Sequence, residues 1–87
     1  MRHAGAAALD QLEPLLARLR QIASLKERTR GVFYLRSKAF LHFHEDPAGL
    51  FADIRAADGR AFERFQIDTA SARDALAETA AQRASEP

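Results

Sequence analysis

The chain has 87 residues, of which 47% are hydrophobic and 29% charged, and its formal net charge is +1. This length suits a single domain with one thin core, here residues 1–87 with frayed ends at 1–9 and 82–87. The near-neutral charge gives no strong field for nucleic acid or anionic membranes. The absence of cysteine excludes disulfides, thiolate metal sites and cysteine nucleophiles. Since no stretch reaches the ~20 apolar residues of a membrane span, we expect a soluble, cytoplasmic protein without membrane partners.

The first predicted element is a helix that begins at Asp10 and ends near Arg28. Asp10 and Glu13 have the spacing of a capping box, and Pro14 falls in the first turn, where proline is tolerated. Apolar residues then recur at helical spacing on one stripe, namely Leu12, Leu15, Leu16, Leu19, Ile22 and Ala23. The basic residues at the end suit the negative pole of a helix, and Gly31 suits its exit.

Four short strands follow, over residues 32–35, 38–45, 50–56 and 61–67. Tight turns connect them at Arg36-Ser37, Asp46-Pro47-Ala48-Gly49 and Asp58-Gly59. Such short links make every neighbouring pair antiparallel. A second helix begins at Ser71, with Asp74 in capping-box position. The predicted fold class is α+β: a helix, a four-stranded antiparallel β-meander and a helix.

These turns also predict which side chains share a face of the sheet. We expect one nearly apolar face to be the core beneath the first helix, with Val32, Tyr34, Ala39, Leu41, Phe43, Leu50, Ala52, Ile54, Phe65 and Ile67. The opposite face forms three rows across the sheet: Phe33, Phe40, Arg55 and Phe62; His42, Asp53 and Arg64; His44, Phe51 and Gln66. Neighbours within a row lie about 5 Å apart at Cβ and can therefore interact.

The run His42-Phe43-His44 is the most suggestive motif for chemistry. Two histidines at strand spacing point to the same side, and the predicted register places Asp53 beside His42. Imidazoles and carboxylates are ligands for divalent transition metals, but pairing with Arg64 would compete for Asp53. The alternative, which we favour, is a half-exposed face where histidine pairs with an acid. We therefore predict a binding site without a bound metal or cofactor at His42, His44, Asp53 and Arg64.

Asp53 could also orient His42 as a general base. No clear nucleophile accompanies it, because Ser37 lies in a turn and Thr69 and Ser71 are expected to cap a helix. A carboxylate shared by two cations favours protonated imidazole, so we expect the pKa of His42 to be raised.

The aromatic row predicts an interface. Exposed Phe33, Phe40, Phe51 and Phe62, with Arg55 between the rings, would form an apolar patch of the kind that binds a partner or a second copy of the chain. Platforms of exposed aromatic and basic residues also bind single-stranded nucleic acid, but the neighbouring acids make that partner unlikely.

The run FYLRSKAFLHFHEDPAGLFADIR, followed by FERFQI, resembles short stand-alone bacterial proteins of unknown function that carry an F-L-H-F-H-E-D / G-L-F-A-D strand pair. The resemblance extends from Leu12 onward and implies a soluble bacterial protein, with no named family and no activity. The predicted role is thus a small interaction or ligand-binding module, not an enzyme, that dimerises through its sheet. The alternative is a metal-dependent or histidine-based enzyme centred on His42, His44 and Asp53.

Overall fold

The computed structural model describes residues 1–86, which form three helices and one antiparallel sheet. In chain order the elements are β1 (Arg2–His3), α1 (Ala6–Gln11), α2 (Glu13–Arg20), β2 (Leu25–Thr29), β3 (Val32–Leu35), β4 (Lys38–Asp46), β5 (Gly49–Arg55), β6 (Phe62–Gln66) and α3 (Ala70–Ala84). The strand order is β2-β3-β4-β5-β6, and β1 pairs with β4. The α+β class and the antiparallel sheet are confirmed, but the predicted four-stranded meander is not, because the sheet has further strands, and three helices replace the predicted two.

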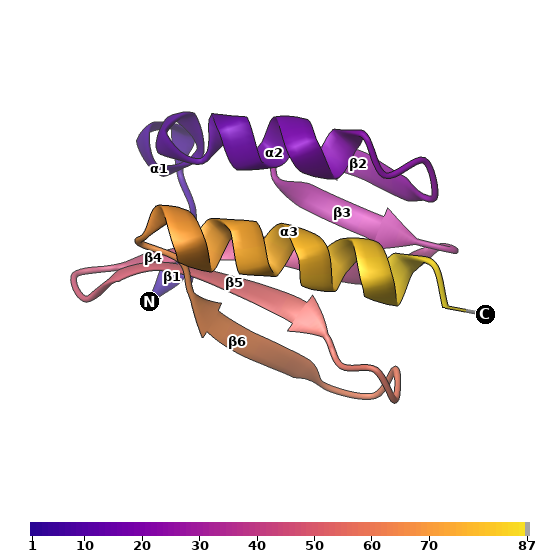
Figure 1. The fold of residues 1–87 in the computed structure, drawn as a ribbon. Coiled ribbons are helices and arrows are strands. Elements are labelled where there is room, and N and C mark those ends of the chain that lie inside the picture. The colour runs from indigo at the N-terminus through magenta and orange to yellow at the C-terminus, as the bar shows by residue number, and fades with distance from the viewer. Residues whose placement is uncertain (87) are drawn as a thin grey trace.

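Helices α2 and α3 lie side by side on one face of the sheet (Figure 1). The leucine stripe of the first helical region is buried as predicted, with Leu12, Leu15, Leu16 and Leu19 in the core. The buried side of α3 is mostly small, with Ala77, Ala80 and Ala84 around Leu76. Within the described residues, no helix covers the opposite face of the sheet, which leaves that face open for a site.

Strand β2 corrects the prediction of one helix from Asp10 to Arg28. Helix α2 ends at Arg20, and the charged run that we assigned to the helix end pairs with β3. Gly31 has φ +80° in the turn between these strands, and a Cβ there would lie 2.7 Å from Leu9 Cδ2. Gly31 therefore serves the turn of the β2–β3 hairpin, where its positive φ favours glycine, rather than the end of a helix.

The ends of the chain are also more ordered than predicted. Residues 2–3 form β1, residues 6–11 form α1, and Ala8 and Leu9 join the core. At the other end, α3 continues to Ala84, so 82–84 are helical; Pro87 lies outside the described residues. The predicted start of the first helix at Asp10 is wrong, because α1 begins after Gly5, whereas the second helix, α3, begins after Thr69, one of its two predicted capping residues.

A bulge in β4 reverses the predicted faces of β3. Phe33 pairs with Leu41 while Tyr34 pairs with Ala39, so Phe40 is an extra residue on β4. Alternation around the bulge places Phe40 and Leu41 both on the helix side, and it moves Phe33 there as well. Phe33 and Phe40 are only 1% and 3% exposed. The prediction that both belong to the outer face is therefore wrong, as is the placement of Val32, Tyr34 and Ala39 in the core face.

This correction removes half of the predicted aromatic patch. Of its four phenylalanines, Phe51 is part-buried and Phe62 is 38% exposed, while the other two are in the core. Phe65, assigned to the core face, is 40% exposed because β6 is an edge strand. The dimer prediction thus rests on Phe51 and Phe62 alone.

Candidate functional site

Asp53 lies at the centre of the open face and is the only buried charged residue among those described. The register that we predicted across β4, β5 and β6 is confirmed here, because Asp53 pairs with both His42 and Arg64. The Arg64 guanidinium donates from Nε to Oδ1 and from Nη2 to Oδ2, each at 2.7 Å. This bidentate bond lowers the pKa of Asp53 against the opposing effect of burial, so the carboxylate is ionised at neutral pH.

Two histidines of β4 face the same carboxylate. His42 Nε2 lies 3.5 Å from Asp53 Oδ2, and His44 Nε2 lies 3.2 Å from the same oxygen. One ligand atom from each of the three residues can be chosen so that all lie within 4.8 Å of one another. Ligand atoms that share one zinc ion at about 2.1 Å lie at most about 4.2 Å apart, so small side-chain rotations would have to bring these three atoms closer together around an ion.

His44 is the unusual member of this cluster. Its side chain is 13% exposed, and neither ring nitrogen has a hydrogen-bond partner in the structure. Although Nε2 lies close to Asp53, the two groups do not meet hydrogen-bond geometry. A buried polar group left without a partner costs about 1–3 kcal/mol, which is why such groups call for a ligand or another explanation.

The pKa of His42 moves in the direction opposite to our prediction. Burial of the ring lowers it below its ordinary value of 6.5, and the attraction of Asp53 is too weak to reverse this effect. His44 and His3 lower it further, since a second positive charge would repel the first. His42 is thus neutral at neutral pH, and neutral imidazole is the form that binds a metal.

The structure adds a third histidine that the sequence did not reveal. His3 on β1 pairs with His44 on β4, and its ring stacks on that of His44 with centroids 4.7 Å apart. The ring centroid of His42 lies 5.8 Å from that of His3. A strand as short as β1 has no hydrophobic period, so no sequence pattern connects His3 to β4.

Phe62 closes one flank of the cluster, with its ring edge-on to His42 at a centroid distance of 5.0 Å. Arg55 lies over the other side of Phe62, 4.7 Å from its centroid, so the predicted cation–π contact is present. The same guanidinium donates to the carbonyls of Ala39 and Gly59. These contacts fix Phe62 as an apolar wall beside the histidines.

The hydroxyl groups that we considered as nucleophiles are engaged elsewhere. Thr69 Oγ1 accepts from the amide of Ala72 and caps α3, as predicted for a helix cap. Ser71 lies beside it in the same helix, and Ser37 is in the β3–β4 turn. Among the described residues, no hydrogen bond connects any of these three hydroxyls with His42.

Comparison of the chain with protein-family models, curated proteins and solved structures finds no match. Among the described residues, no helix has the length and apolar character needed to cross a membrane.

Proposed function

We propose that this protein is a small metal-binding module in which His42, His44 and Asp53 hold a divalent transition-metal ion such as zinc. The observation that carries the proposal is His44, a buried imidazole with no hydrogen-bond partner, aimed at a buried carboxylate. A metal ion would satisfy one of its nitrogens and would compensate the charge of Asp53 at the same time.

The two imidazoles and one carboxylate favour zinc and similar transition-metal ions over calcium or magnesium. Two imidazole nitrogens and one carboxylate oxygen suit zinc, cobalt, nickel or copper, whereas calcium and magnesium prefer an all-oxygen set. Three protein ligands leave a position on the ion, and His3 is the nearest further imidazole. We expect either its exposed ring, after a side-chain rotation, or a water molecule to fill this position.

The proposal is tested by titrating the metal-free protein with zinc and following the histidine ring signals by NMR. We expect His42 and His44 to shift together and to saturate at one zinc per chain. His44→Gln should abolish this saturable shift, because it removes the ligand whose nitrogens have no other partner.

Two matched variants separate ligands from neighbours. Asp53→Asn should weaken binding strongly, while Gln66→Ala, on the same face in the next row, should leave it unchanged. His3→Gln reports whether the fourth ligand is protein or water. Zinc that shifts all three histidines without saturation, or binds equally to His44→Gln, would contradict the proposal.

A further inference from the structure

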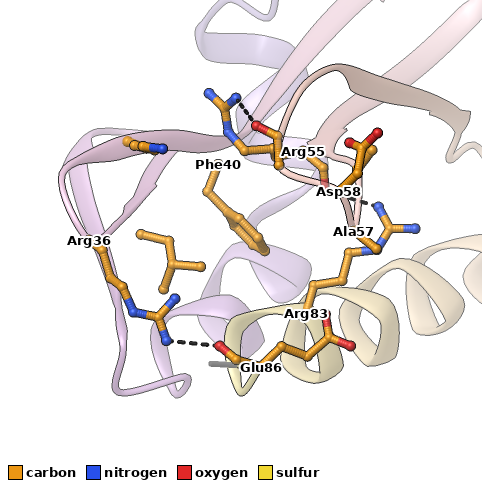
Figure 2. A pocket seen from close by; sticks show the side chains of 11 residues that line it. Arg36, Phe40, Arg55, Ala57, Asp58, Arg83 and Glu86 are labelled. Atoms are coloured by element: carbon orange, nitrogen blue, oxygen red, sulfur yellow. Dashed lines mark hydrogen bonds between the residues drawn. The ribbon is translucent and has the colours of Figure 1, made fainter.

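A hollow lies between the C-terminal end of α3, the β3–β4 turn and the connection from β5 to β6, and none of the histidines lines it (Figure 2). Its volume is about 340 Å³, within the range of small-molecule sites. Residues from four parts of the chain converge on it, namely Leu35 and Arg36 before the β3–β4 turn, Lys38 and Phe40 after it, residues 55–59 with the acidic Asp58, and Arg83 and Glu86 at the end of α3.

The hollow has an apolar floor. The bulge in β4 turns Phe40 to this side of the sheet, where its ring points into the hollow (Figure 2). Leu35 packs against the same core from the neighbouring strand. Because Phe40 is only 3% exposed, the ring closes the bottom of the hollow and gives a ligand an apolar surface to rest on, without an open aromatic face.

The rim carries an excess of positive charge. Arg83 is already paired, because it binds the Glu63 carboxylate at 2.7 Å and the Arg55 carbonyl at 3.0 Å. Arg36 instead donates to the main-chain carbonyl of Glu86, at 2.9 Å. Basic residues at the hollow outnumber acidic ones. Within residues 1–86, neither Arg36 nor Lys38 has a carboxylate at ion-pair distance.

The turn that carries Arg36 is held in a conformation that its residues disfavour. Arg36 and Ser37 have φ of +51° and +71°, values for which hairpins ordinarily use Asn-Gly. The chain thus keeps a long cation at a position where a smaller residue would be more stable, as is common at binding sites.

We propose that this pocket binds a small organic anion with an apolar body, such as an aromatic carboxylate. The body rests on the apolar floor of the hollow, and the carboxylate pairs with the cations of the rim, Arg36 and Lys38. None of the proposed metal ligands lines this pocket, so the failure of one proposal leaves the other intact.

The test is an NMR titration of the full chain with naphthoate, with naphthyl methanol as the neutral analogue and inorganic phosphate as the bare anion. For an aromatic anion of this size we expect a dissociation constant on the order of 1 mM. The amides of Leu35, Phe40 and Arg83 should shift with naphthoate. The neutral analogue and phosphate should each bind roughly tenfold more weakly.

The chain has one other lysine, Lys26 on β2, which makes a matched control. Lys38→Gln should weaken naphthoate binding severalfold, and Lys26→Gln should not. Ser37→Gly keeps both cations and should bind as the natural chain does. Shifts outside the pocket, equal binding of the neutral analogue or of phosphate, or no effect of Lys38→Gln would each overturn the proposal.

Discussion

Replacing His44 with phenylalanine should stabilise the metal-free protein, although most core substitutions destabilise a domain. Both ring nitrogens of His44 are buried without a hydrogen-bond partner. Phenylalanine keeps the flat ring, removes the unpaired nitrogens and still stacks on His3. Asp53 retains both bonds from Arg64.

The expected gain follows from the burial of the ring. An unpaired buried polar group costs about 1–3 kcal/mol, and the ring is 13% exposed, so we expect a gain of about 1–2 kcal/mol. Zinc should reverse the order of the two proteins. At a free zinc concentration of 100 times its dissociation constant, the natural chain gains about 2.7 kcal/mol and the variant gains nothing.

Urea unfolding of both proteins, with a chelator and then with zinc, measures these changes as shifts of the midpoint. In the metal-free measurement His3→Phe is the matched control, because it replaces an exposed histidine on the same face and should change stability by less than about 0.5 kcal/mol. A variant His44→Phe that is less stable than the natural chain without metal, or that still gains stability from zinc, would contradict this prediction.

Three further predictions concern the neighbours of His44 and the core. Arg64→Gln should tighten zinc binding about tenfold, because zinc then no longer competes with the two charge-assisted hydrogen bonds that Arg64 donates to Asp53. Calorimetry measures this change. Weaker binding would show that zinc does not use the Asp53 carboxylate. The folded protein lowers the pKa of His42, so the unfolded chain takes up this proton first as the pH falls. The metal-free protein should therefore lose stability as the pH falls from about 6.5, the pKa in the unfolded chain, to the lower pKa of His42 in the folded protein. His42→Gln should remove this loss in urea titrations across pH, and an unchanged pH profile would count against it. Phe40→Ala should cost about 3–5 kcal/mol in thermal or urea unfolding, since the ring is 3% exposed; a cost below about 1 kcal/mol would place Phe40 on the surface.

Much of the sheet could be predicted because its turns have strong local signals. The Asp46–Gly49 and Asp58-Gly59 turns set the register that places Asp53 between His42 and Arg64. The leucine stripe of α2 was likewise readable, since its period matches a helix. These local patterns were sufficient to place His42, Asp53 and Arg64 side by side on β4, β5 and β6.

The errors come from features that depend on distant partners. A bulge leaves no local mark, yet one extra residue at Phe40 moved Phe33 to the other face. Strand β2 is rich in charged residues and forms only because β3 offers it an edge. His3 joins the site through two residues of β1, and the pKa of His42 depends on burial that the sequence does not show.

Native mass spectrometry of the protein, first metal-free and then with a slight excess of zinc, tests the metal-binding proposal most directly. It also counts subunits, and a monomer would exclude the predicted dimer through Phe51 and Phe62. We expect one zinc ion per chain for the natural protein and none for the variant carrying both His44→Gln and Asp53→Asn. No bound zinc in the natural protein, or equal zinc in both, would contradict it.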